Sequence, residues 1–248
     1  MTTSWRPATC VDVRVETSTA RSIRLKIADL GSVVPGQHVD IRLTADDGYQ
    51  AVRSYSLSAT PGGGPAGRRL ASDEVEITVE ELPEGEVSPY LVQGLDVGDA
   101  LEVRGPIGGW FVWHEADPSP VQLIGGGSGI APLMAILRAR APSNSAVPMR
   151  LLYSVRTPEA FYYRDELAAL SGDALVEVDV VYTRSAPEGW PRQPGRINAA
   201  DIENRVQDPS AGTVYVCGPN AFVASITDLL VARGHDPATI RTERFGGA

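Results

Sequence analysis

Gly125-Gly126-Gly127-Ser128-Gly129-Ile130-Ala131-Pro132 decides the fold of this 248-residue chain. The apolar run 121–124 precedes it, and after it apolar residues recur at helical spacing as far as Leu137. A strand, a glycine turn and a helix start in this order present backbone amides that can hold a pyrophosphate. Pro132 stands where the usual fingerprint has its third glycine, so this is not the standard dinucleotide motif.

The chain on either side of this turn alternates strands and helices from residue 118 onward. Short apolar runs at 121–124, 151–155, 175–182 and 214–217 predict buried strands, and helical spacing appears over 130–137, 161–170 and 222–230. This alternation predicts a doubly wound parallel sheet covered on both faces. We expect a second domain at residues 118–248, with the polar, proline-rich stretch 115–120 as the hinge between the two domains.

The first part of the chain has a different periodicity. Apolar and polar residues alternate over 11–15, 23–27, 39–43 and 75–79, with glycine and proline turns between these runs. Half-buried strands produce this period of two, and several at this spacing predict an antiparallel β-barrel. We expect this barrel to occupy residues 1–117.

Composition narrows the possible functions. The hydrophobic content of 43% suffices for packed cores, and the formal charge of −9 argues against nucleic-acid or anionic-membrane binding. No apolar run is long enough to span a bilayer, and residues 1–7 lack the apolar core of a signal peptide. We therefore expect no nucleic-acid partner, no membrane insertion and a cytoplasmic location.

Cys10 and Cys217 are the only cysteines. Both lie in apolar, strand-like surroundings, which favours reduced, partly buried thiols over a disulfide framework. An iron–sulfur cluster held by four cysteine thiolates cannot be built from two.

Arg53-Ser54-Tyr55-Ser56 is the first candidate site, expected at the end of a barrel strand. The arginine can bind a pyrophosphate, the tyrosine ring can lie against an isoalloxazine, and a nearby hydroxyl can bond a flavin nitrogen. About thirty residues later, Gly85-Glu86-Val87-Ser88-Pro89-Tyr90-Leu91 predicts a short helix that is capped by Ser88 and offers amides to a phosphate. An ordinary strand with an exposed arginine and a capped connector helix are the alternatives.

Residues after the second and third strands of the second domain bear on the choice of nucleotide. No acid follows the second strand to hold a ribose 2′-hydroxyl; Ser154 and Arg156 stand there instead, and Arg184 ends the third strand. These groups can bind a 2′-phosphate, so the pattern favours NADPH over NADH. Solvated surface arginines are the alternative.

Two further groups lie near the chain's last strands. Cys217-Gly218-Pro219 ends the fourth strand of the second domain, where such sheets bind ligands, although a core cysteine is the alternative. Glu243 and Phe245 are expected in a tail that follows a last strand. Glu243 can donate or orient a proton, and Phe245 can stack near a flavin or anchor the strand.

In this order the Arg-x-Tyr-Ser run, the residues 85–91, the glycine turn and residues 215–220 resemble the ferredoxin-NADP reductase family over residues 9–245. The resemblance implies FAD held by Arg53, Tyr55, Ser56 and the Val87–Ser88 turn, with Ser56 near flavin N5. It also implies NAD(P)H on the 126–130 loop, with Cys217 and Gly218 near the nicotinamide. FMN is the less expected flavin.

The chemistry that the resemblance implies is hydride transfer from nicotinamide C4 to flavin N5, followed by release of single electrons. Because the four-cysteine segment is absent, we expect a separate acceptor such as ferredoxin, flavodoxin or an oxygenase component. The alternatives are a reductase of free flavin or small molecules, and an electron-transfer subunit of a larger redox complex.

Overall fold

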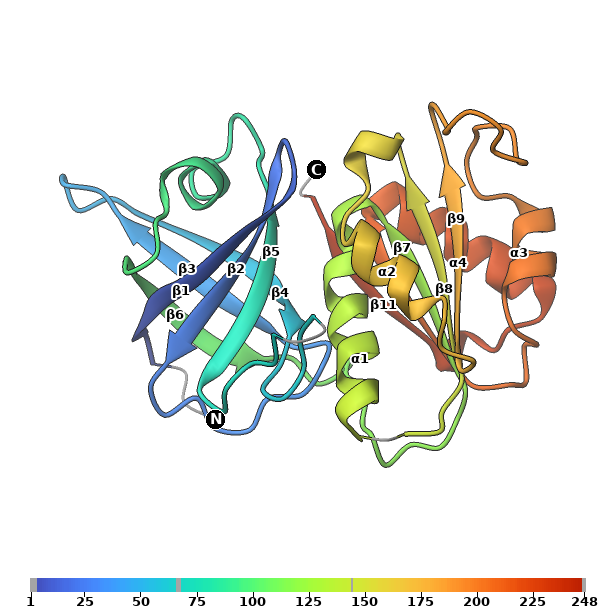
Figure 1. Ribbon diagram of the computed structural model, residues 1–248, viewed down its shortest axis with the longest axis horizontal. Coiled ribbons are helices and arrows are strands. Elements are labelled where there is room, and N and C mark those ends of the chain that lie inside the picture. Colours follow the sequence, from blue (N-terminus) through green and yellow to red (C-terminus); the bar gives the residue numbers. More distant parts are fainter. Residues whose placement is uncertain (1–3, 66–67, 144, 247–248) are drawn as a thin grey trace. The chain divides into compact units, whose positions relative to one another are not determined.

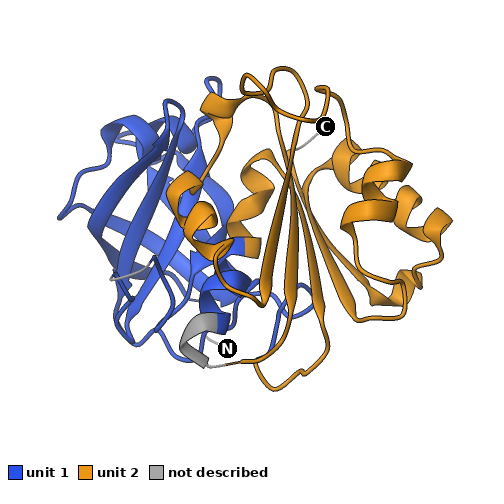
Figure 2. Cartoon of the chain, turned by 45° about the vertical axis from the view of Figure 1, so that its right-hand side comes forward, with its two compact units in different colours: residues 1–114, 134–143 blue, residues 115–133, 144–248 orange. Residues whose placement is uncertain are grey.

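The computed structural model describes residues 4–65, 68–143 and 145–246. The chain forms two compact units, one of residues 1–114 and 134–143 and one of residues 115–133 and 144–248 (Figure 2). The chain first passes between units after His114. The domain boundary expected between residues 117 and 118 stays a prediction.

The first unit is built on a closed barrel of antiparallel strands in the order β1-β2-β5-β4-β3-β6 (Figure 1). The predicted antiparallel barrel is therefore confirmed. Each predicted alternating run lies inside one of its strands, which are β1 (Arg6–Thr17), β2 (Ala20–Ile27), β3 (His38–Thr44), β4 (Gln50–Ala59), β5 (Glu74–Glu80) and β6 (Ala100–Ile107).

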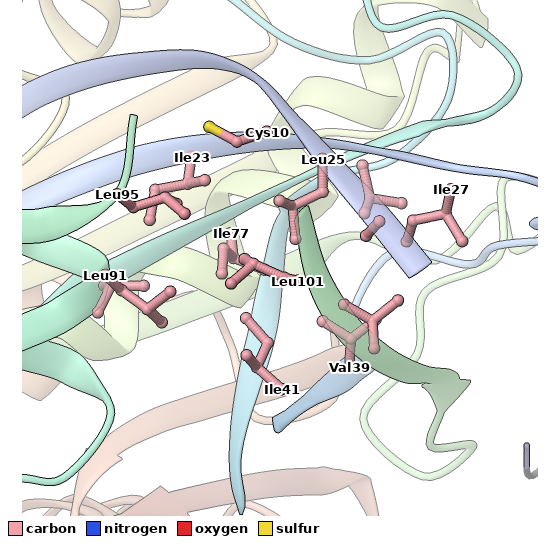
Figure 3. Close-up of a cluster of buried hydrophobic side chains, with 14 of the residues drawn as sticks. Cys10, Ile23, Leu25, Ile27, Val39, Ile41, Ile77, Leu91, Leu95 and Leu101 are labelled. Carbon is pink, nitrogen blue, oxygen red and sulfur yellow. The ribbon is translucent and has the colours of Figure 1, made fainter. Parts of the chain in front are cut away.

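The barrel core follows from the alternation. Ile23, Leu25 and Ile27 of β2 are at most 1% exposed and pack with Ile77 and Ile41 of other strands (Figure 3). In a strand, residues two apart share one face, so a single alternating run delivers a whole row of apolar side chains to the interior.

The second unit contains a five-stranded, fully parallel sheet in the order β11-β10-β7-β8-β9. This confirms the predicted doubly wound sheet, since the order reverses direction on either side of β7. The strands are β7 (Val121–Gly126), β8 (Met149–Val155), β9 (Val176–Tyr182), β10 (Thr213–Pro219) and β11 (Ile240–Phe245).

Helices connect these strands on both faces of the sheet (Figure 2). Apolar residues of α3 and α4, among them Ile202, Val223 and Ile226, pack with Ile124 and Val216 of the sheet. The helices are α1 (Ile130–Ser143), α2 (Arg164–Leu170), α3 (Ala199–Arg205) and α4 (Asn220–Arg233), with short 3₁₀ turns η2 (Gly127–Gly129), η3 (Pro158–Ala160) and η4 (Pro237–Thr239). No helix among the described residues is long and apolar enough to cross a membrane.

Two sequence expectations about this unit are wrong in detail. The helical stretch expected from residue 161 begins only at Arg164, because Tyr163 adopts a left-handed conformation with φ of 55° that breaks the helix. Residues 240–245, expected as a tail after a last strand, are themselves strand β11, paired in parallel with β10.

A buried ion pair joins the second part of α1 to the barrel within the first unit. Arg138 Nη1 lies 2.7 Å from Glu76 Oε1, and the two side chains are 1% and 2% exposed. The same nitrogen donates to the Ser58 carbonyl at 2.9 Å, and the Ser58 hydroxyl donates to Glu76 at 2.9 Å. Charges taken out of water are tolerated only with such partners.

His235, after α4, should make stability depend on pH. Its side chain is 2% exposed, neither ring nitrogen has a hydrogen-bond partner among the described residues, and burial lowers its pKa below the usual value. The unfolded chain then binds the extra proton first, so this residue lowers stability as the pH falls below about 6.5. We expect His235→Leu to reduce the loss of melting temperature between neutral and mildly acidic buffer, measured by calorimetry; an unchanged loss would contradict this role.

Candidate functional site

Strand β4 carries the Arg53–Ser56 run along an open edge of the barrel. It pairs with β3 from Gln50 to Ser56, but with β5 only at Leu57 and Ala59. No described strand therefore pairs with the other edge of residues 50–56. The run lies in the middle of β4 rather than at its end, which corrects the expectation. An open strand edge offers a row of backbone donors and acceptors to a flat heterocycle.

Arg53 is held by an acid that the sequence reasoning did not single out. Its Nη2 donates to Glu86 Oε2 at 2.5 Å, and its Nη1 donates to the Val52 carbonyl at 2.7 Å. The Tyr49 hydroxyl donates to the other oxygen, Glu86 Oε1, at 2.5 Å. The hydrogen bond from Tyr49, followed by that from Arg53, lowers the pKa of Glu86, which therefore stays ionised at neutral pH.

The other members of the run differ in what their side chains do. Tyr55 packs against the barrel core, and burial raises its pKa to about 12, so the hydroxyl stays protonated. The Ser54 hydroxyl donates to Asp40 Oδ1 at 2.6 Å, and Asp40 also accepts two hydrogen bonds from Arg104. Ser54 is thus engaged in the barrel wall; its role at a cofactor stays a prediction and rests on its backbone. Ser56 lies opposite His38 across the β3–β4 ladder.

The segment that follows β5 contains the expected short helix, η1 (Tyr90–Gly94), but the helix lacks the expected cap. Ser88 makes no cap; its hydroxyl instead accepts a hydrogen bond from the Leu82 amide at 3.0 Å, and the helix is only five residues long. The close approach favours glycine at position 85, because a Cβ there would lie 2.9 Å from that hydroxyl and 3.0 Å from the Leu82 carbonyl oxygen. Val87 is fully buried, so only its backbone can reach a ligand.

A cavity of about 520 Å³ opens beside the cluster formed by Tyr49, Arg53 and Glu86. It is lined by side chains of β3, β4, β6 and η1 together with two members of the cluster, among them Leu43, Ala51, Leu101, Tyr90, Tyr49 and Glu86. The half-exposed Arg53, the open strand edge, the partly buried Tyr55 and the adjoining cavity with polar and apolar lining are the donor set and the space that a flavin dinucleotide needs. The residues present fit FAD.

The glycine turn of the second unit is built for close packing on one side. A Cβ on Gly129 would lie 2.3 Å from the Cys217 carbonyl oxygen, and one on Gly126 would lie 2.8 Å from the Phe222 ring. Gly127 has φ of +57°, and a Cβ there would meet nothing within 4 Å. The turn is therefore pressed against β10 on one side and open at Gly127, where Ser128 and the start of α1 with Ile130 and Pro132 follow. This arrangement fits a dinucleotide pyrophosphate.

The predicted phosphate-binding groups come together at one edge of the sheet. Ser154 of β8 pairs in register with Gly126 of β7. The Arg184 amide donates to the Arg156 carbonyl at 2.9 Å, which places the two arginines side by side after β8 and β9. Both arginines are exposed, and neither forms an ion pair with a described residue.

Cys217 lies inside the sheet between Gly125 of β7 and Glu243 of β11. Burial, and then the charge of Glu243, raises the pKa of its thiol well above the usual value. The thiol is therefore neutral at physiological pH and cannot act as a thiolate nucleophile. Gly218 and Pro219 end β10, and Phe245 pairs in register with Pro219.

Two groups at the first unit's site were missed by the sequence reasoning, namely Glu86 and Tyr49. Glu86 stands inside the quoted run 85–91, so an acid beside a predicted anion site was visible in the sequence. Tyr49 gave no signal, because only folding of the β3–β4 hairpin brings its hydroxyl to Glu86.

Two family models match the chain in order. The oxidoreductase FAD-binding domain matches residues 13–112, and the oxidoreductase NAD-binding domain matches residues 123–228. The chain belongs to the ferredoxin-NADP reductase family. The predictions of an FAD site and an NAD(P) site are thereby confirmed at the level of the domains.

Curated relatives of this family member include a glycine betaine monooxygenase reductase subunit of Chromohalobacter salexigens, 31% identical over 86% of this chain. A propane 2-monooxygenase reductase component of Rhodococcus jostii is 30% identical over 94% of this chain. The chain spans only 56% and 62% of the lengths of these two relatives.

Among solved structures, the flavohem-like FAD/NAD-binding domain of nitric oxide dioxygenase from Vibrio cholerae O1 biovar El Tor superposes with a TM-score of 0.83. It is 27% identical, and the match covers 98% of this chain and 99% of that one.

Proposed function

We propose that this chain is an NAD(P)H-dependent flavoprotein reductase that passes electrons to a separate acceptor, for which an oxygenase component is the first candidate. The proposal rests on the presence of two features in one chain. The first is an open β4 edge that bears Arg53 and Tyr55, and the second is a glycine turn that packs closely against Cys217. The names of the two curated relatives, both reductase parts of monooxygenases, favour an oxygenase component over ferredoxin or flavodoxin.

The barrel's residues would bind and orient the flavin. Bound FAD supplies the conversion between a two-electron donor and a one-electron acceptor. Arg53 would neutralise the diphosphate, with backbone amides of the Gly85–Ser88 turn beside it. Tyr55 would present its ring, and Ser56 would offer a hydroxyl to the flavin nitrogen that gains and loses a proton.

The second unit's residues would bind the nicotinamide nucleotide. The amides of residues 126–130 would hold its pyrophosphate, while Ser154, Arg156 and Arg184 would hold a 2′-phosphate and so favour NADPH. Cys217, kept neutral by burial, would place an uncharged, polarizable sulfur beside Gly218 and near the nicotinamide ring. Glu243 would hold or move a proton near the carboxyl edge of the sheet, and Phe245 would stack near the flavin. The cytoplasmic location also stays a prediction.

Anaerobic titration tests the proposal directly. The visible flavin band of the purified chain should bleach at about one equivalent of NADPH, since a hydride carries both electrons that one flavin accepts. Reoxidation by an added oxygenase component, ferredoxin or flavodoxin then ranks the acceptors. A colourless protein, or a yellow one that neither nucleotide bleaches, contradicts the proposal; fast turnover of free flavin without any gain from a protein acceptor favours a free-flavin reductase.

Arg53→Ala should release the flavin. Losing a charge-assisted contact to a diphosphate costs about 1.5–3 kcal/mol, or roughly ten- to a hundredfold in flavin affinity. The flavin-to-protein absorbance ratio after gel filtration measures this. Lys26→Ala, which removes an exposed barrel cation paired with Asp73 at 3.4 Å, is the control and should retain the flavin. Full retention by Arg53→Ala would contradict the assignment.

Arg156→Ala should change the choice of nucleotide. We expect the KM for NADPH to rise about tenfold and that for NADH to change little, because only NADPH carries the 2′-phosphate that this cation would bind. Steady-state kinetics with both nucleotides measure this difference. Arg150→Ala, on strand β8 that precedes Arg156 and paired with Glu177 at 2.6 Å, should affect both nucleotides equally little. Equal effects of Arg156→Ala on the two would refute the phosphate role.

A further inference from the structure

Glu86 is an ionised carboxylate at the point where the proposed flavin phosphate would bind. Its Oε2 lies 2.5 Å from Arg53 Nη2, and its Oε1 accepts the Tyr49 hydroxyl. A phosphate that contacts the Arg53 guanidinium therefore comes close to a second anion. Both side chains of the ion pair are about half exposed, so water screens this repulsion without removing it.

The repulsion acts differently on the two biological flavins. FMN ends in a phosphate monoester, which concentrates a charge of about −2 on one phosphorus at neutral pH. FAD carries its charge on two phosphorus atoms, so that only part of it needs to lie beside Glu86. Riboflavin carries no phosphate and is indifferent to this carboxylate.

The space beside Glu86 adds a second difference. The cavity of about 520 Å³ has Tyr49 and Glu86 in its lining, along with apolar groups such as Leu43 and Leu101. A flavin that continues beyond its phosphate into this cavity gains contacts there with the neutral adenosine half of FAD. FMN has nothing to place in it.

We infer that Glu86 determines flavin specificity, by rejecting the terminal phosphate of FMN while tolerating the diphosphate of FAD. The inference rests on the proposed function, because it assumes that Arg53 binds a flavin phosphate. Glu86 would act as a specificity residue through the negative charge of its carboxylate.

The test compares three flavins on the full chain. Dissociation constants for FAD, FMN and riboflavin are measured by flavin fluorescence with wild type and Glu86→Gln. We expect the substitution to tighten FMN more than FAD, narrowing the ratio of the two constants about fivefold, as one screened unit charge at this range predicts. Riboflavin binding should stay the same, and raising the salt concentration should shrink the effect.

Two variants separate charge from structure. Glu84→Gln removes an exposed acid two residues away and should leave the FAD-to-FMN ratio as in wild type. Tyr49→Phe keeps the carboxylate and should keep the rejection of FMN. An unchanged ratio in Glu86→Gln, or equal weakening of all three flavins, would overturn the specificity role. Wild type that binds none of the three would instead refute the proposed function itself.

Discussion

Glu76→Gln is expected to lower the free energy of unfolding by about 3–5 kcal/mol, the cost of leaving a buried charge without its counter-ion. The change keeps the shape of the side chain but removes the carboxylate that faces Arg138 at 2.7 Å, where both groups are at most 2% exposed. Arg14 Nη2 also lies 3.8 Å from Glu76, so two guanidinium groups would lose a shared anion. Urea unfolding followed by circular dichroism measures the loss.

A double substitution shows whether charge is the cause. Replacing both partners, as Glu76→Leu with Arg138→Met, should recover most of the stability, because a buried pair replaced by apolar groups costs little. Glu102→Gln is the matched surface control, since its bonds to Arg42 at 2.9 and 2.6 Å are good but the pair is partly exposed. A loss in Glu76→Gln no larger than in this control would show that the buried pair is dispensable.

The strands and the glycine turn could be predicted because their signals are local. Alternation over residues 23–27 places three apolar side chains on one face whatever the strand's partners are, and all three lie in the core. The run 125–132 specified a strand, a turn and a helix start within a dozen residues, and β7, η2 and α1 follow it. Local patterns of this kind survive changes elsewhere in the chain.

Sequence-based prediction was weakest where a side chain forms a hydrogen bond with a residue that its own sequence segment does not indicate. Ser88 suits a helix cap by type, but the turn back to Leu82 claims its hydroxyl first. Ser54 likewise donates its hydroxyl to Asp40 of the neighbouring strand, a partner that its own segment does not indicate, while its role at a cofactor stays a prediction. Hydrogen-bond partners across a sheet depend on strand order and register, which alternation alone does not specify.

The candidate site itself divides in the same way. The roles of Arg53 and the 126–130 turn could be proposed from residue types and spacing. That Glu86 forms an ion pair with Arg53 follows only from the fold. Arg138 lies 62 residues from Glu76 in the sequence, and no pattern within either segment indicates that they meet. Ion pairs between residues that are far apart in the sequence are therefore the part of this structure that sequence periodicity does not predict.

Gly129→Ala is expected to abolish tight NAD(P)H binding while the barrel keeps its flavin. A Cβ at this position would lie 2.3 Å from the Cys217 carbonyl oxygen and 2.7 Å from the Gly218 nitrogen, both backbone atoms that cannot rotate away. The turn must then move off β10, which costs about 1–3 kcal/mol of overpacking strain and displaces the amides proposed to hold the pyrophosphate. We expect nucleotide affinity to fall at least about tenfold, equivalent to 1.4 kcal/mol.

Calorimetric titration with NADPH and with NADH measures this loss, and both nucleotides should lose affinity alike, because the pyrophosphate is common to them. This equality distinguishes the turn from Arg156, whose replacement should affect NADPH alone. Gly195→Ala is the control: a Cβ there would meet nothing within 4 Å, so binding should be unchanged. Unaltered binding by Gly129→Ala would mean that the turn does not need its close contact with β10, and the nucleotide site would have to be sought elsewhere on the sheet edge.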